Sequence, residues 1–355
     1  MSRIDLVMIV RDEARCLDRC LASARDHVDG IVVVDTGSVD ATVEIAKRHG
    51  AAVHRFAWID DFAADRNAAL AASDAPWRLV LDADEWIAEG GAALRAIGAG
   101  IEPFIGLIPV TSAFDAVGGG VEEAPSWLPR LLPRGVAYAG RIHEQPQSAL
   151  PRRRLPVAIG HDGYRDAQKA GKAGRNARLL ELALCEAPGD SYLRYQRGKD
   201  LELAARFAAA APHYLHALQG CDARAAWRHD LVLRALFTLK KLGRHDEAMA
   251  LAEAEMPHWS GSPDFFFALG DVLLDWAATR PEHGARLLPM IESSWLRALE
   301  IGEQPALQDS VRGRGSFLAA HNLAVLHESL GKGAAAAQWR EREAALRASG
   351  VASSN

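Results

Sequence analysis

The sequence feature that most constrains the fold of this chain is a short apolar stretch that ends in a cluster of acids. Residues 77–81 read Trp-Arg-Leu-Val-Leu, and Asp82, Asp84 and Glu85 follow directly. Strands tolerate aspartate poorly in their interiors, so the acids mark the carboxyl end of a strand. In an open α/β sheet, ligands bind at that end. Asp82 and Asp84 can both face one crevice, where they would suit Mg²⁺ or Mn²⁺ held against a diphosphate; an acidic turn in solvent is the alternative.

The N-terminal part of the chain alternates between two kinds of segment. Apolar runs predict strands at residues 4–10, 31–34, 52–56 and 77–81, and the intervening segments predict helices at residues 16–27, 39–49 and 62–72. Strands separated by helices imply right-handed βαβ units and a mainly parallel sheet. Between residues 101 and 159, short apolar runs alternate with proline and glycine, which predicts mixed strands and loops. Residues 116–126 contain three glycines and predict a mobile loop over the site.

From about residue 166, the composition favours helices almost to the end of the chain. Helical pairs recur at a period in the thirties to low forties, at residues 191–206 with 208–218, 227–242 with 245–255, 263–279 with 284–299, and 317–330 with 334–346. This pattern loosely resembles tetratricopeptide repeats. We therefore predict an α/β, Rossmann-like domain over residues 1–165, an all-α repeat domain over 166–349 and a disordered tail over 350–355.

Composition narrows the classes of function. The chain has 355 residues and a net charge of -5, without the basic footprint of a nucleic-acid-binding protein. Its four cysteines favour neither a zinc site nor a disulfide framework, and reduced thiols fit a cytoplasmic protein. Charged residues flank the apolar run near the N-terminus, so we predict neither a signal peptide nor a membrane span. Peripheral association with a membrane stays open, as does homo-oligomerisation through the helical domain.

Three further motifs accompany the acidic turn. Residues 11–13, Arg-Asp-Glu, follow the first predicted strand, and Asp35 ends the second strand before a turn at Gly37. A carboxylate at a strand end can accept a hydrogen bond from a nucleobase imide. Arg66 and Asn67 lie in the first turns of a helix near the same edge, where they could meet a phosphate or a ribose. Taken singly, each motif is explained as well by a turn former or a surface cation.

In this order, the motifs resemble glycosyltransferase family 2. The residues that carry the resemblance are Asp35-Thr36-Gly37-Ser38, Arg66-Asn67 and Leu81-Asp82-Ala83-Asp84. The resemblance covers roughly the first half of the chain and implies a GT-A fold and a nucleotide-sugar donor. The form Asp82-Ala83-Asp84-Glu85-Trp86 further resembles a branch with C-terminal tetratricopeptide-type helices. That branch includes sublancin-type peptide S-glycosyltransferases and lipopolysaccharide-core glycosyltransferases.

The resemblance implies a role for each matched residue. Arg11 and Glu13 occupy the loop that holds the nucleotide, although family members commonly have Lys-Asn-Glu there. Asp35 matches the acid that contacts the base, and Asp82 matches the acid near the ribose and diphosphate. Asp84 matches the metal ligand, which implies Mn²⁺ or Mg²⁺ as the cofactor.

Two later segments resemble histidine motifs of the same branch. In residues 140–144, we expect Glu144 to be the general base, with His143 and Asp115 as further candidates. In residues 159–164, we expect His161 to bind the metal beside the carboxylate. A buried or turn histidine and a surface ion pair are the structural alternatives.

These expectations define an inverting, metal-dependent glycosyltransferase. It would move a sugar from a nucleotide-sugar donor, a UDP-sugar by expectation, to a peptide or glycan acceptor, and Trp86 would offer its aromatic face to the sugar. One alternative is a non-catalytic adaptor whose repeats bind a protein partner; the intact acids argue against it. Another is a nucleotidyltransferase, which would need a glycine-rich phosphate loop that residues 11–13 do not supply.

Overall fold

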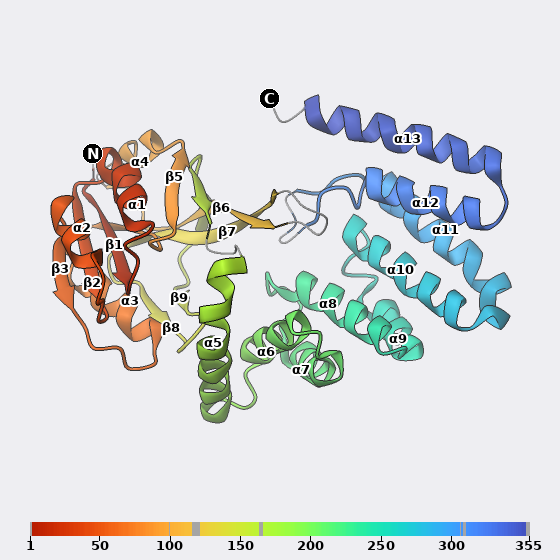
Figure 1. Cartoon of the computed structure of the whole chain (residues 1–355), viewed down its shortest axis with the longest axis horizontal. Coiled ribbons are helices and arrows are strands. Elements are labelled where there is room, and N and C mark those ends of the chain that lie inside the picture. The colour runs from red at the N-terminus through yellow and green to blue at the C-terminus, as the bar shows by residue number, and fades with distance from the viewer. Residues whose placement is uncertain are drawn as a thin grey trace. The chain divides into compact units, whose positions relative to one another are not determined.

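The chain folds into two compact units (Figure 1). The computed structural model describes residues 2–98, 100–115, 121–162, 166–305, 307 and 310–352. Contacts between residues divide it into Met1–Pro188 and Gly189–Asn355. Helix α5 (Asp166–Glu186) therefore counts with the first unit. The domain limits that we place at residues 165 and 349 stay predictions.

A mixed sheet forms the centre of the first unit. Over the described residues it has nine strands, in the order β3-β2-β1-β4-β7-β6-β11-β5, with β10 beside β6. Their bounds are β1 (Ile4–Val10), β2 (Gly30–Asp35), β3 (Ala52–Arg55), β4 (Trp77–Val80), β5 (Glu85–Glu89), β6 (Ile105–Asp115), β7 (Val121–Pro133), β10 (Arg152–Arg154) and β11 (Ala158–His161). Strands β1 to β4 run parallel, whereas β7 lies antiparallel to both β4 and β6. Strands β8 (Ala137–Ala139) and β9 (Gln145–Gln147) pair separately.

Helices cover both faces of the parallel part of this sheet. They are α1 (Leu17–Ala24), α2 (Thr42–Arg48) and α3 (Phe62–Ala71), and a short α4 (Ala92–Arg95) follows β5. Alternate residues of β1 point to opposite faces, so Leu6 packs in the cluster that contains Leu17 of α1, and Val7 packs in the cluster that contains Leu70 of α3. Each such buried aliphatic side chain contributes about 1.5–3 kcal/mol. The continuous apolar runs of the sequence therefore reflect burial on two sides, and the predicted α/β class is confirmed.

The strand order reverses at β1, and this reversal positions the site. The chain runs from β1 outward to β2 and β3, and then crosses to β4 on the other side of β1. The register pairs Val10 with Asp35 and Val7 with Val80. The carboxyl ends of β1, β2 and β4 consequently share one edge, and sheets of this kind bind ligands in the crevice at such a reversal.

The structure differs from the predicted elements around the acidic turn. Strand β5 was not predicted, and it begins at Glu85, the last of the three acids. Asp84 therefore lies between two strands and is only 6% exposed, so it is not part of an acidic turn in solvent. Of the predicted loop over residues 116–126, residues 116–120 lie outside the described part, and the rest belongs to β7.

The second unit consists of helices that pack on their sequence neighbours. The pairs are α6 (Ser191–Leu203) with α7 (Phe207–Gly220), α8 (Arg228–Lys241) with α9 (His245–Glu255), α10 (Pro263–Thr279) with α11 (Gly284–Ile301), and α12 (Phe317–Ser329) with α13 (Gly333–Ala352). Gly243 and Gly331 follow α8 and α12 with φ of 66° and 70°, the left-handed conformation that ends a helix at low cost in glycine. The predicted tetratricopeptide-like region is confirmed. Among the described residues, no helix has the length and apolar character to cross a membrane.

Candidate active site

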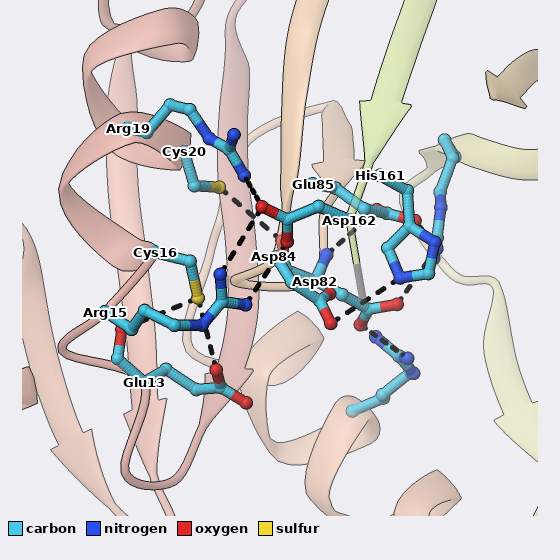
Figure 2. A network of polar contacts seen from close by, with 12 residues as sticks. Glu13, Arg15, Cys16, Arg19, Cys20, Asp82, Asp84, Glu85, His161 and Asp162 are labelled. Carbon is cyan, nitrogen blue, oxygen red and sulfur yellow. Dashed lines mark hydrogen bonds and ion pairs between the residues drawn. The ribbon is translucent and has the colours of Figure 1, made fainter. Parts of the chain in front are cut away.

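The acidic turn between β4 and β5 is held by hydrogen bonds from its own residues and from α1 (Figure 2). The N–H of Asp82 donates to Glu85 Oε2 at 3.0 Å, and the N–H of Glu85 donates to the carbonyl of Asp82 at 3.0 Å. The Cys20 thiol lies 3.6 Å from the same carbonyl and donates to it. The turn is therefore a fixed platform for its carboxylates.

Five charged side chains of alternating sign meet at this turn. We call them the charge row, in the order Glu144, Arg66, Asp82, Arg130 and Glu85. Arg66 Nη2 donates to Asp82 Oδ1 at 2.8 Å, and Arg130 Nη2 donates to Asp82 Oδ2 at 2.9 Å. Arg66 also donates to Glu144, and Arg130 to Glu85. Helix α3, strand β7 and the start of strand β5 thus converge on Asp82, and the segment after β8 joins them through Glu144.

The charge row fixes the ionisation of Asp82. Burial opposes its charge, but the guanidinium groups of Arg66 and Arg130 outweigh burial and lower the pKa of Asp82 below its usual range. For Glu85, burial is the stronger influence and raises the pKa despite Arg130. Asp82 therefore stays an anionic hydrogen-bond acceptor throughout the neutral range.

Asp84 and His161 form the pair that we expected to bind a metal. His161 Nε2 in β11 lies 3.5 Å from Asp84 Oδ2, because β11 pairs with β5 and brings His161 opposite Glu85. Burial lowers the pKa of His161, but the nearby Asp84 carboxylate outweighs it and raises that pKa. The N–H of Asp162 donates to the Asp84 carbonyl at 3.3 Å and holds the end of β11 against the turn.

This pair fits a hard divalent cation that is shared with a phosphate ligand. The described residues contain no group of three or more His, Cys, Asp or Glu side chains that are placed so that they could hold a metal ion together. Mg²⁺ is commonly bound by one or two carboxylates together with substrate phosphates, so a full set of protein ligands is not required. One carboxylate and one imidazole leave positions for diphosphate oxygens and water.

The loop after β1 is held by the motif that follows β2. The side chains of Ser38, Asp40 and Thr42 accept hydrogen bonds from the backbone of this loop, namely Asp12 N to Ser38 Oγ (3.0 Å), Glu13 N to Thr42 Oγ1 (2.7 Å) and Ala14 N to Asp40 Oδ2 (3.0 Å). Asp12 returns a bond by accepting from the N–H of Val39 at 2.8 Å. The sequence indicated only a turn here, because the hydrogen-bond partners of these side chains lie in another loop.

The predicted nucleotide-binding acids lie at the shared edge. Asp35 ends β2, is buried, and accepts a hydrogen bond from the N–H of Ser38 at 3.0 Å. Arg11 is half exposed and follows β1. The Glu13 carboxylate accepts from the Cys16 thiol at 3.2 Å, and burial raises the pKa of that thiol to about 12. Cys16 is therefore an uncharged donor at neutral pH.

The side chains of Asn67 and Trp86 already contact other groups of the protein in this structure. The Asn67 amide donates to the carbonyl of Tyr138 at 2.9 Å and accepts from its N–H at 2.8 Å, which ties α3 to β8. Arg19 lies 3.7 Å from the centroid of the Trp86 ring. These contacts favour a structural role for Asn67, and the sugar contact of Trp86 stays a prediction.

Replacing Gly160 is expected to disturb this part of the site. A Cβ at Gly160 would lie 2.3 Å from the Trp86 ring, so Gly160→Ala should displace the indole. We expect a loss of about 1–3 kcal/mol of unfolding free energy, as for other overpacked positions, and a shift in tryptophan fluorescence. Gly174→Ala is the matched control, because none of the described atoms outside its own helix turn lies within 4 Å of its Cβ position. Equal melting temperatures for the two variants would contradict this account of the packing.

The segment that carries the candidate bases is a bend with two left-handed residues. Gly140 has φ of 102° and His143 has φ of 52°, a conformation that costs about 1–3 kcal/mol outside glycine. Glu144 follows directly, and its carboxylate accepts from Arg66 within the charge row. The side chain of Asp115, the other candidate base, lies outside the described residues, as do Gly163 and Tyr164.

Two charged residues of the site were missed by sequence reasoning. Arg130 lies in β7, and its only signal is a charge inside a strand that reads Trp-Leu-Pro-Arg-Leu-Leu. Asp65 in α3 is fully buried, and neither of its oxygens has a hydrogen-bond partner among the described residues. Burial, with a contribution from Asp61, raises the pKa of Asp65 to about 7.

Comparison with known proteins identifies a family match and several similar proteins. The model of the family described as "Glycosyl transferase family 2" matches residues 5–97. A TPR repeat-containing protein of Synechococcus elongatus is 34% identical over 272 residues, which cover 72% of this chain and 66% of that protein. The glycosyltransferase SunS of Bacillus subtilis is 26% identical over 205 residues, 55% of this chain and 48% of SunS. The chain thus spans about two thirds and about half of the length of these relatives.

Among solved structures, the crystal structure of MamA aligns with a TM-score of 0.40 and 12% identity. The alignment covers 52% of this chain and 94% of MamA.

Proposed function

We propose that this chain, which carries a glycosyltransferase family 2 domain followed by a tetratricopeptide-like helical region, transfers a sugar from a nucleotide-sugar donor to a peptide or glycan. One observation carries the proposal. Asp35, Asp82 and the Asp84–His161 pair lie at the carboxyl edge of the sheet where the strand order reverses. Acids and an imidazole at that crevice suit a nucleotide, its diphosphate and a cation.

The donor site is formed by the ends of three strands. Asp35 would accept a hydrogen bond from the base, and Arg11 and Glu13 would line the loop that holds the nucleotide. Asp82 would accept from the ribose, because its partly exposed carboxylate is kept anionic by two arginines. A UDP-sugar is the donor that we infer.

Asp84 and His161 would hold Mn²⁺ or Mg²⁺ against the diphosphate. A bound cation would offset the charge that develops on the departing diphosphate. The protein's contribution is rigidity, since the turn before β5 fixes Asp84 and its pairing with β11 fixes His161.

The acceptor would attack the sugar from the face opposite the diphosphate, in one inverting displacement. A carboxylate must then take the acceptor proton, and we assign this role to Glu144, with His143 beside it. We infer that the helical unit contributes to recognition of the acceptor, since helical repeats offer extended binding surfaces.

The cysteines of the described chain are free, which supports a cytoplasmic location.

Nucleotide binding tests the donor assignment. Asp35→Ala removes the acid proposed to contact the base, and losing a hydrogen bond to a charged group weakens binding by roughly ten- to a hundredfold. Calorimetric titration with UDP should show this loss, whereas Asp29→Ala, at the opposite end of β2, should bind UDP as the wild type does. Unchanged affinity in Asp35→Ala would remove Asp35 from the site.

A further inference from the structure

A buried arginine supports Asp82 from the side of the sheet. Arg130 lies in β7, which pairs with β4, and its side chain is 9% exposed against 34% for Asp82. Its Nη2 donates to Asp82 Oδ2 at 2.9 Å and also to Glu85. Because Asp82 is the more exposed of the two, Arg130 would act on a ligand in the crevice through Asp82.

Glu85 completes the support. Its Oε2 accepts the N–H of Asp82 at 3.0 Å, while Oε1 accepts from Arg130. Asp82 is consequently fixed at its backbone by Glu85 and at its two carboxylate oxygens by Arg66 and Arg130. Three separate contacts determine where this carboxylate points.

The contacts leave part of the carboxylate available. An ionised carboxylate has about four lone-pair positions, and the two arginines use one on each oxygen. One position on each oxygen remains. Two remaining acceptor positions, one on each oxygen, match in number the two O–H donors of a vicinal diol, such as the 2′ and 3′ hydroxyl groups of a ribose.

Stability alone does not account for this group of charges. Taking ions out of water is costly, and buried ion pairs can often be replaced by apolar residues without loss of stability. Glu85 is 2% exposed, and Arg130 is nearly as buried. The group lies at the reversal of strand order, where ligands bind, which favours a role in recognition.

We propose that Arg130, with Glu85 behind it, is a positioning residue that presents Asp82 to the ribose diol and so makes the site prefer ribonucleotides to deoxyribonucleotides. This inference rests on the proposed function and specifies one feature of its donor. Neither Arg130 nor Glu85 touches the nucleotide.

The test compares two nucleotides on full-length variants. Calorimetric titration with UDP and with 2′,3′-dideoxyuridine diphosphate gives an affinity ratio for each protein. Because hydrogen bonds to a charged acceptor are lost, the wild type should prefer UDP by about ten- to a hundredfold. In Arg130→Met the ratio should fall to within about twofold, since Asp82 keeps the contact of Arg66 to Oδ1 but loses the one that orients Oδ2.

Two further variants separate positioning from folding. Arg130→Met leaves Glu85 buried without its cation, so the double variant Arg130→Met/Glu85→Gln removes both charges and should fold while lacking the preference. Arg78→Met is the matched control, because Arg78 is a buried arginine of β4 that donates to the carbonyls of Leu70 and Ser73. It should keep the wild-type ratio even if its melting temperature falls.

The possible results distinguish a failure of the positioning role of Arg130 from a failure of the proposed function. A wild-type ratio in either folded Arg130 variant overturns the positioning role alone, and so does a wild type that binds UDP without preference for ribose. A folded wild type that binds no ribonucleoside diphosphate overturns the proposed function and this inference together.

Discussion

Asp84→Asn is expected to lose almost all transfer activity while the protein stays folded. Asparagine keeps the volume of the buried side chain but removes the charge that would hold a divalent cation beside His161. A cation at a developing anion is worth several kcal/mol, so the rate should fall by roughly a thousandfold. Turnover with Mn²⁺ or Mg²⁺ and the melting temperature, measured on the same samples, check both parts.

Asp74→Asn is the control for this variant, because Asp74 is an exposed aspartate that pairs with Arg3 and precedes β4, whereas the acidic turn follows β4. It should retain wild-type turnover. Full wild-type activity in excess EDTA would contradict the metal assignment, whatever the activity of Asp84→Asn.

Glu144→Gln is expected to bind the donor normally and to lose turnover by about 10²–10⁴-fold, the range of general-base contributions. Glutamine keeps the shape of the side chain but cannot take a proton. In the structure, Glu144 accepts a hydrogen bond from Arg66, so the substitution also alters a contact of the charge row. Separate measurement of kcat and of the donor KM distinguishes a lost base from a disturbed charge row.

A loss in donor affinity with unchanged kcat would show that Glu144 only orients Arg66. A fully active Glu144→Gln would move the role of base to His143 or Asp115. With a thiol acceptor the loss should be smaller, since a thiolate forms readily near neutral pH.

The sequence was sufficient where a signal is local. The apolar runs predicted β1, β2 and β4, and the acids after them were expected at one edge because parallel strands end together. This local reasoning did not bring Asp84 and His161 together; only the resemblance to a family predicted that they share a site. Strand β11, which brings His161 beside the acid, pairs with β5, and β5 itself was not predicted.

The sequence was insufficient where a contact depends on pairing between distant segments. Arg130 belongs to no motif, and it reaches Asp82 only because β7 lies between β4 and β6. The pairing of Asn67 with the backbone of Tyr138 depends in the same way on where β8 packs against α3. The chemistry of a side chain can be predicted from the local sequence, but its hydrogen-bond partner is determined by the topology of the sheet.

Donor turnover tests the central claim most directly. The full chain would be incubated with a UDP-α-sugar and Mn²⁺, with water as the acceptor, and followed by NMR of the anomeric proton. The account predicts release of UDP and first formation of the β-anomer, both dependent on the cation and absent in Asp84→Asn. First formation of the α-anomer would contradict inversion, and a folded protein that releases no nucleotide from any nucleotide-sugar would contradict the glycosyltransferase assignment itself.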